Sequence, residues 1–330
     1  MAASSLALTW AEHRRTQELC AGLGLELVVL KDRGRGLRRY ADLVWRTRAL
    51  LASRQADVLL VTNPSLILAA LCVLLRRVHA YQLIVDAHNE AVTPYINRQG
   101  WIRRLSRWVI RHSDLTIVTN SQLGTLVAGY GGRPFVLPDR IPTPPREAAA
   151  PVLPGTFNAV LIATYAPDEP IAEVLEAVRG LDIQLHVTGN PRKLEARIRE
   201  GAPPNVHFTG FLEEAAYWGL LRAADAVVDL TLMDDCLVCG AYEALSLGKP
   251  MVLSNNAASV DLFADAAVFT DNSSGDIRRA LEAVRGRHAQ LRAAAERRRV
   301  ELMEGWEASA HNLAGMIAAR RSTVTQEPAG

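Results

Sequence analysis

Two carboxylates, Asp235 and Glu243, stand with seven residues between them in the most chemically informative segment, residues 234–254. Small residues precede Glu243, and Gly-Lys-Pro and an apolar run follow it. The pattern predicts a helix with Glu243 in its first turn and its end at Gly248, then a buried strand. Unpaired N–H groups and a positive dipole end at a helix N-terminus suit a phosphate. A carboxylate there can accept hydrogen bonds from ribose hydroxyls, so the segment indicates a nucleotide site.

Each of these side chains also has a plain structural interpretation. Glu243 could cap its helix, and Asp235 could be a solvated loop acid. Cys236 and Cys239 form a Cys-x-x-Cys pair, which could be a redox pair or half of a zinc site. The sequence has no second Cys-x-x-Cys or His-x-x-x-His to complete a metal site. We therefore expect reduced cysteines, no metal and no cofactor besides a donor substrate.

The elements that must position this segment alternate between strand and helix. In the first half, apolar runs predict strands at 6–9, 25–30, 57–62, 81–86 and 115–119. Helical spacing predicts helices at 16–23, 37–53, 66–77 and 102–111. Short strands that alternate with helices are typical of parallel βαβ units.

A Pro-rich stretch at 137–145, followed by Ala-rich residues up to Pro154, predicts an interdomain linker. The alternation then restarts with strands at 159–163, 184–188, 206–208, 226–230 and 250–254. Helices are expected at 171–179, 243–247 and 274–284, and several more from about 289 to 320. We predict an α/β protein with two Rossmann-like, doubly wound parallel-sheet domains, 1–145 and 146–330. The ligand is expected in the cleft that faces the carboxyl ends of the strands.

These features resemble the retaining glycosyltransferases of family 4, which have the GT-B fold. The family signature is two glutamates with seven residues between them, then Ala, Gly-x-Pro and apolar residues. Here Asp235 and Glu243 are followed by Ala244-Leu-Ser-Leu-Gly-Lys-Pro-Met-Val252. Similar segments lie at 84–89, 114–120, 208–212 and 217–226. Residues 306–313 resemble the family's closing helix, which implies a helix at about 303–320 that crosses back to the first domain.

The resemblance implies roles for individual residues on the donor side. Glu243 would bind the ribose, and Asp235 would bind hydroxyls of the donor sugar. His88, which follows a strand of the first domain, would lie near the anomeric carbon, although a lone histidine is usually structural. The remaining donor-binding candidates lie in three loops and are Gly189, Asn190, Arg192, Lys193, Phe211, Leu212, Leu237, Val238, Cys239 and Gly240.

On the acceptor side we expect His13, Arg14, Arg15 and Asn89. The two arginines open the first helix, so they could meet the phosphates of a lipid-linked acceptor. If the enzyme inverted instead, it would need a general base in the first domain, and Asp86, His88 and Glu90 would be the candidates.

Three departures from the family pattern affect the site. Asp235 is one methylene shorter than the usual glutamate, and Val238 stands where the family commonly has glycine. The Arg and Lys that normally follow the first strand of the second domain are missing, and this chain has an acidic loop at 163–170. Either Arg192 and Lys193 take over, or helix N-termini stabilise the leaving group, or catalysis has been lost.

The expected function is therefore transfer of a sugar from a nucleotide-sugar to a glycan, a lipid-linked or a small-molecule acceptor in glycan synthesis. Negative charge that develops on the departing diphosphate must be met by preorganised N–H groups and cations. Two alternatives stay open. One is a GT-B sugar-nucleotide epimerase, and the other is a catalytically silent protein that binds a sugar-nucleotide within a glycan-assembly complex.

The charge is unevenly divided along the chain. Residues 1–150 hold 20 Lys and Arg against 11 Asp and Glu, a net charge of +9, whereas the remainder carries −7. The segment 101–111 combines four arginines with two tryptophans, which suits an anionic membrane surface or, alternatively, an ordinary helix with a solvated basic face. We see no signal peptide and no apolar run of membrane-spanning length. We expect a cytoplasmic protein, with peripheral contact at the inner membrane face as an open alternative and no nucleic-acid partner.

Overall fold

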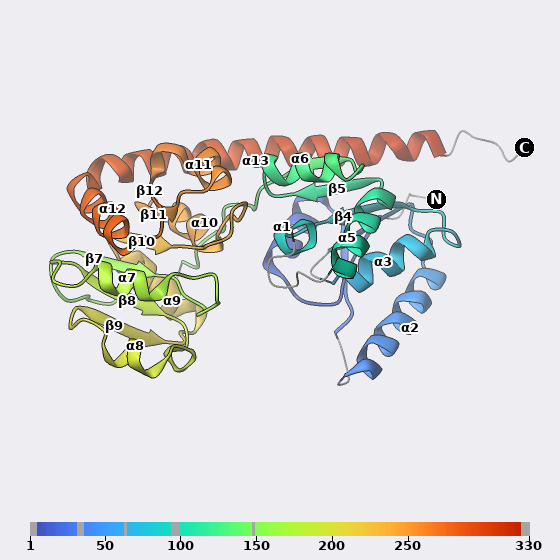
Figure 1. Ribbon diagram of the computed structural model, residues 1–330. Helices are drawn as coiled ribbons and strands as arrows, with labels where there is room; N and C mark the ends of the chain where they lie inside the picture. Colours follow the sequence, from blue (N-terminus) through green and yellow to red (C-terminus); the bar gives the residue numbers. More distant parts are fainter. Residues whose placement is uncertain (1–4, 32–35, 63–64, 94–99, 147–148, 325–330) are drawn as a thin grey trace, which may run out of the picture. The chain divides into compact units, whose positions relative to one another are not determined.

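The computed structural model describes residues 5–31, 36–62, 65–93, 100–146 and 149–324. The chain divides into two compact units, each built on its own sheet (Figure 1). Unit 1 comprises Met1–Arg140 and Glu304–Gly330, and unit 2 comprises Ile141–Met303. Both sheets are six-stranded and parallel, which confirms the predicted α/β class.

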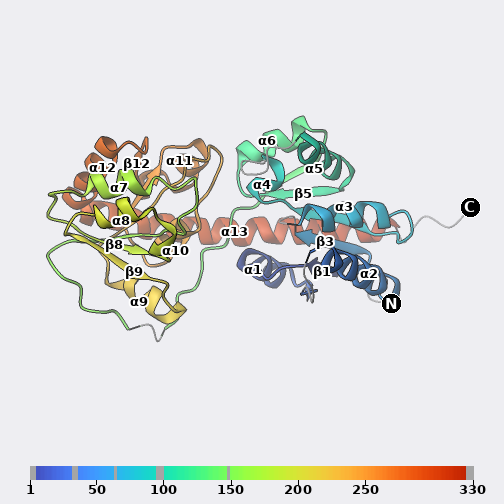
Figure 2. The ribbon, with the colours of Figure 1, turned by 60° about the horizontal axis from the view of Figure 1, so that its bottom comes forward.

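The sheet of unit 1 has the order β2-β1-β3-β4-β5-β6. Its strands are β1 (Ser5–Thr9), β2 (Glu26–Val29), β3 (Val58–Thr62), β4 (Gln82–Asp86), β5 (Leu115–Val118) and β6 (Pro134–Val136). The helices of this half are α1 (Arg14–Leu23), α2 (Leu37–Ser53), α3 (Leu66–Leu75), α4 (Asn89–Val92), α5 (Gly100–His112) and α6 (Ser121–Gly129). Helices α4, α5 and α6 gather near β5 (Figure 2).

Alternating residues of the central strands of unit 1 pack into two cores, one on each face of the sheet. Leu59 and Val61 of β3 belong to one core, and Val58 and Leu60 belong to the other. The second core is completed by Trp306 and residues after it on the last helix, α13 (His288–Val324). Such burial on both faces explains why the parallel strands are nearly continuous apolar runs.

Unit 2 has the strand order β12-β11-β10-β7-β8-β9. Its strands are β7 (Asn158–Leu161), β8 (Gln184–Thr188), β9 (Val206–Gly210), β10 (Ala226–Asp229), β11 (Met251–Ser254) and β12 (Ala267–Thr270). Its helices include α7 (Ile171–Ala177), α8 (Ala196–Glu200), α9 (Glu214–Ala223), α10 (Cys239–Ser246), α11 (Ala257–Phe263) and α12 (Ser274–Gly286). Short 3-10 turns lie at Pro191–Lys193 and Ala264–Ala266.

The long closing helix differs from the sequence expectation. Several helices were predicted between about 289 and 320, but α13 is one continuous helix of 37 residues. Its residues up to Met303 belong to unit 2, and those from Glu304 belong to unit 1. None of the helices in the described part of the chain is long and apolar enough to cross a membrane.

Candidate functional site

The sheet of unit 2 reverses its winding between β7 and β10, because the chain builds strands on one side of β7 and then returns to add β10 on the other. In open α/β sheets, ligands bind outside the carboxyl ends of the strands at such a switch point. The loops that follow β7 and β10 therefore bound the candidate site of unit 2. They include the acidic loop 163–170 and the segment that leads into α10.

The buried acid Asp229 is the last residue of β10, at the carboxyl end of that strand. Its carboxylate accepts a hydrogen bond from the backbone N–H of Gly240 at 2.8 Å, in the first turn of α10. Burial raises the pKa of Asp229 well above its usual range, and the nearby carboxylates Glu169, Glu243 and Asp168 raise it further, whereas the Gly240 N–H opposes the shift. The side chain of Asp229, at the end of β10, thus caps the N-terminus of α10.

Gly240 is the residue that this cap requires. A Cβ at this position would collide with the carboxylate of Asp229 and with the side chain of Ile162. Because its N–H group is already donated to Asp229, Gly240 does not offer that N–H to a phosphate in this conformation. Its predicted role in donor binding is therefore not supported through the backbone.

Helix α10 begins earlier than the sequence predicted. Its first residue is Cys239 and its N-cap is Val238, so Glu243 lies one turn into the helix rather than in the first turn. The prediction that Glu243 is favoured by the helix dipole in the first turn is therefore wrong. Its carboxylate instead accepts a hydrogen bond from the hydroxyl of Tyr217, which comes from α9.

Both carboxylates of the acidic loop after β7 accept hydrogen bonds from the protein. Glu169 accepts hydrogen bonds from the backbone N–H groups of Thr164 and Tyr165, the latter at 2.7 Å, and from the hydroxyl of Thr164 at 2.6 Å. Asp168 accepts a hydrogen bond from the Thr231 hydroxyl at 2.8 Å, which ties this loop to the one after β10. Tyr165 has a φ of 60°, a conformation that non-glycine residues rarely adopt. These contacts explain how the loop keeps two carboxylates without a family Arg or Lys.

The segment after β8 lies against the same loop. The ammonium of Lys193 donates to the carbonyl of Thr164 at 3.1 Å, and Arg192 is exposed. Asn190 caps the short turn Pro191–Lys193 through the N–H of Arg192. Gly189 has a φ of 82°, and a Cβ there would collide with the carbonyl of Ala163. Lys193, one of the two predicted replacement cations, therefore contacts the loop that lacks the family cations.

The other predicted donor residues of unit 2 lie on two loops. Asp235 is half-buried, and burial together with Asp234 raises the pKa of its carboxyl group. Its loop is fastened by Asn256, whose amide donates to the carbonyl of Cys236 at 3.2 Å. The half-buried candidates are Leu212, Leu237 and Val238, and the exposed ones are Phe211 and Cys239. Phe211 is 80% exposed, a conspicuous value for an aromatic side chain.

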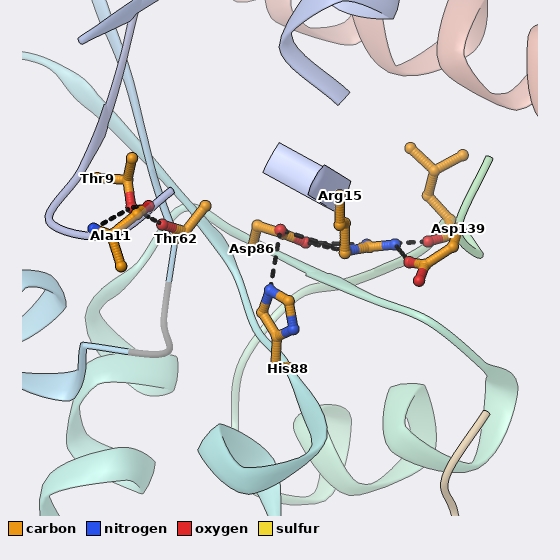
Figure 3. Close-up of polar contacts among 8 residues, drawn as sticks. Thr9, Ala11, Arg15, Thr62, Asp86, His88 and Asp139 are labelled. Atoms are coloured by element: carbon orange, nitrogen blue, oxygen red, sulfur yellow. Dashed lines mark hydrogen bonds and ion pairs between the residues drawn. The ribbon is translucent and has the colours of Figure 1, made fainter. Parts of the chain in front are cut away.

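A second polar cluster lies in unit 1 and is built around Arg15 (Figure 3). The guanidinium donates to Asp86 through Nε at 3.0 Å and Nη2 at 2.9 Å, and to the carbonyl of Leu137 at 3.0 Å. It also pairs with Asp139. Arg15 is 7% exposed, so it holds three segments of unit 1 together and is not available to an acceptor phosphate. The prediction for Arg15 is corrected accordingly.

His88 stands beside this cluster, at the N-cap of α4. Its Nε2 is 3.7 Å from a carboxylate oxygen of Asp86, and its ring lies edge-on to that of His13, with centroids 4.6 Å apart. Burial lowers the pKa of His88, Asp86 opposes this, and Arg15 and His13 lower it further. The lowered pKa favours the neutral imidazole of His88, in which one ring nitrogen can accept a hydrogen bond and the other can donate one.

The remaining unit 1 candidates differ in how accessible they are. Asp86 is fully buried and is occupied by Arg15, which makes it unsuitable as the general base of an inverting reaction. Glu90 and Asn89 are half-buried in α4, and Arg14 is exposed at the start of α1. The structure thus brings His13 and His88 together with Arg15 and Asp86.

Sequence reasoning missed Tyr217 and Asp229. A charged residue near the end of the apolar run 226–230 was the available signal for Asp229, because a carboxylate in a fully buried strand requires a partner. No local signal identified Tyr217. Within the residues that the structure describes, no group of three or more His, Cys, Asp or Glu side chains could hold a metal ion.

Two family models match the chain in the order of its two units. One, described as a glycosyl transferase 4-like domain, matches residues 4–142, and the other, described as glycosyl transferases group 1, matches residues 166–284. No curated protein matches the sequence.

Solved structures share the fold at low sequence identity. A sucrose-phosphate synthase from Thermosynechococcus elongatus is 14% identical, with a TM-score of 0.79 over 97% of this chain and 100% of that one. HepE of Anabaena, in complex with UDP and glucose, is 14% identical, with a TM-score of 0.69 over 96% of this chain and 91% of that one. A Listeria monocytogenes protein assigned as a UDP-N-acetylglucosamine 2-epimerase is 15% identical, with a TM-score of 0.66 over 99% and 98%.

Proposed function

We propose that the chain is a glycosyltransferase, because glycosyltransferase family models match residues 4–142 and 166–284 and the fold is that of GT-B enzymes. In this proposal it transfers a sugar from a nucleoside-diphosphate sugar to a glycan, lipid-linked or small-molecule acceptor. The observation that carries the donor assignment is the carboxylate of Glu243, held by Tyr217 beside the switch point of unit 2. HepE, a structural relative, is described in complex with UDP-glucose, which supports this class of donor. Retention of configuration and a reaction without metal belong to the proposal.

The proposal gives the remaining residues of unit 2 distinct roles. Phe211, which is largely exposed after β9, offers a ring on which the base can stack. Arg192 and Lys193 meet the diphosphate, whose negative charge grows as the glycosidic bond breaks. Asp235 accepts hydrogen bonds from hydroxyls of the donor sugar. In unit 1, His88, His13, Asn89 and Arg14 are assigned to the reacting carbon and the acceptor.

Incubation with a panel of nucleotide-sugars and candidate acceptors tests the proposal. A glycosyltransferase releases nucleoside diphosphate and forms a glycosylated product. An epimerase returns the nucleotide-sugar with one inverted sugar centre, the outcome that the fold of the Listeria protein makes relevant. Binding of nucleotide-sugar without either product would identify a catalytically silent protein, and the acidic loop 163–170 is the feature that makes this outcome relevant.

Replacement of His88 by alanine is expected to reduce turnover about 10- to 100-fold, because small losses of alignment at the reacting centre have effects of this size. The affinity for nucleoside diphosphate should change by less than about twofold, since we assign His88 to the reacting carbon and not to the nucleotide. Steady-state kinetics and calorimetry measure the two quantities separately. Parallel losses in turnover and affinity would instead indicate a general binding role, and the absence of any loss would make His88 structural.

The charge pattern also leads us to propose that unit 1 contacts an anionic membrane through the outer face of α5. Val109 and Ile110 are buried in the core, whereas Trp101 is 61% exposed and Arg103 and Arg104 are exposed. Further along the same helix, Trp108 and His112 line a hollow of about 320 Å³ together with Val73, Leu74, Arg76 and Arg77. Exposed aromatic and basic side chains together favour the interface of a negatively charged bilayer.

Vesicle co-sedimentation tests this contact. Each basic residue near an anionic surface contributes about 1 kcal/mol, so replacing both Arg103 and Arg104 by glutamine should weaken binding roughly 25-fold at low salt. The matched control replaces Arg197 and Arg199 of α8 in unit 2 and should bind as the wild type does. Equal recovery of the wild type in the supernatant with anionic and with neutral vesicles would refute membrane contact.

A further inference from the structure

The contact between Tyr217 and Glu243 joins two helices of unit 2. Tyr217 lies on α9 and Glu243 on α10, and the phenol donates its proton to Oε2 of the carboxylate. The ring of Tyr217 packs against a hydrophobic core of unit 2 that includes Trp218 and Leu245, and it lies edge-on to Trp218, with ring centroids 6.1 Å apart. The phenol is therefore anchored by its ring as well as by its hydroxyl.

The direction of this hydrogen bond is fixed by the surroundings. Burial raises the pKa of the Tyr217 hydroxyl far above its usual value, and the neighbouring carboxyl groups of Glu243 and Asp229 raise it further. The phenol therefore keeps its proton and donates it in the hydrogen bond to the Glu243 carboxylate. A hydrogen bond to the ionised form stabilises that form.

A glutamate on a helix surface has several rotamers, and fixing such a side chain upon binding costs conformational entropy. Tyrosine has only two side-chain torsions, and the ring of Tyr217 is already packed. The hydrogen bond therefore restricts one oxygen of Glu243 before a ligand arrives. Such preorganisation increases affinity without adding any contact to the ligand.

We propose that Tyr217 is a positioning residue of the nucleotide site, which orients the Glu243 carboxylate toward the ribose hydroxyls and thereby sets the preference for nucleotides that carry them. This inference rests on the proposed function, because it takes Glu243 as the ribose ligand. Tyr217 does not touch the ligand. Its effect on affinity is transmitted through Glu243 and depends on the hydroxyls that Glu243 binds.

Calorimetry with UDP, GDP and ADP, each compared with its 2′,3′-dideoxy counterpart, tests this role. The variants are then titrated with the nucleotide that the wild type binds most tightly and with its dideoxy counterpart. Tyr217→Phe should weaken binding of the ribonucleotide about three- to tenfold, the worth of one hydrogen bond, and leave binding of the dideoxynucleotide unchanged. In the Glu243→Ala background, Tyr217→Phe should cause no further loss of ribonucleotide affinity.

Tyr81→Phe is a matched control for the loss of a buried phenol. The hydroxyl of Tyr81 donates to the carbonyl of Cys72 at 2.6 Å in the core of unit 1. This variant should lower the unfolding temperature and keep the wild-type preference for the ribonucleotide. It separates a general loss of stability from a specific loss of ribose recognition.

The outcomes distinguish this inference from the proposed function. Equal losses for both nucleotides in Tyr217→Phe, or a ribose preference that Glu243→Ala abolishes and Tyr217→Phe retains, would overturn the role of Tyr217 alone. A wild type that binds a nucleotide without ribose preference would overturn the assignment of Glu243 together with this inference. A wild type that binds none of the nucleotides would overturn the proposed function itself.

Discussion

Glu243→Ala is expected to weaken binding of the nucleotide-sugar by about 1.5–3 kcal/mol, roughly 10- to 150-fold, because hydrogen bonds to a charged group are lost. The fold should survive, since Glu243 is half-buried and its neighbours Ala244 and Leu245 carry the packing of α10. The variant leaves the hydroxyl of Tyr217 without its carboxylate acceptor, which adds a small local cost.

Calorimetric titration with the donor or its nucleoside diphosphate measures this loss, and thermal unfolding shows whether the fold is kept. Glu214→Ala is a matched control, because Glu214 is an exposed glutamate in the first turn of α9 in the same unit. That variant should bind as the wild type does. Unchanged donor affinity in Glu243→Ala, with a wild type that binds, would remove Glu243 from the nucleotide site.

Arg15→Ala should lower the free energy of unfolding by about 3–5 kcal/mol, the range for loss of one partner from a buried ion pair. Asp86 has no exposed surface and would lose the hydrogen bonds that Nε and Nη2 of Arg15 donate to it. Asp139 and the carbonyl of Leu137 would lose the same partner. Urea-induced unfolding measures the change.

Two further variants test whether the loss of stability comes from the broken ion pair. Arg14→Ala alters the exposed neighbour at the start of α1 and should change stability by less than about 0.5 kcal/mol. Arg15→Met combined with Asp86→Leu removes both charges and should restore most of the stability, as buried pairs replaced by apolar residues often do. A stable Arg15→Ala protein with weakened acceptor binding would contradict the structural role and would indicate that Arg15 binds the acceptor.

Most of the fold could be predicted because the central strands of both sheets are buried on both faces and are therefore apolar runs. The two strands that were not predicted, β6 and β12, lie at the sheet edges. Strand β6 has only three residues, of which Pro134 and Val136 are exposed. Both strands are short, with three residues in β6 and four in β12, so the sequence offers little to distinguish them from loops.

The errors at the site have a different origin, because they depend on contacts between residues far apart in the chain. Arg15 was assigned to the acceptor because its partners Asp86 and Asp139 lie 71 and 124 residues away in the sequence. The start of α10 was placed too late because its cap comes from Asp229 rather than from a neighbouring Ser, Thr, Asn or Asp. Whether Glu243 and Asp235 bind the donor stays a prediction.

The cap between Asp229 and Gly240 also constrains how this protein can evolve. Any side chain at 240 would occupy the space of the Asp229 carboxylate, and loss of the carboxylate would remove the acceptor for the N–H of Gly240. Neither residue can be exchanged alone without disturbing the other. Homologues that keep this helix start should therefore inherit both residues or replace both, and this paired inheritance is a mark by which divergent sequences with the same arrangement can be recognised.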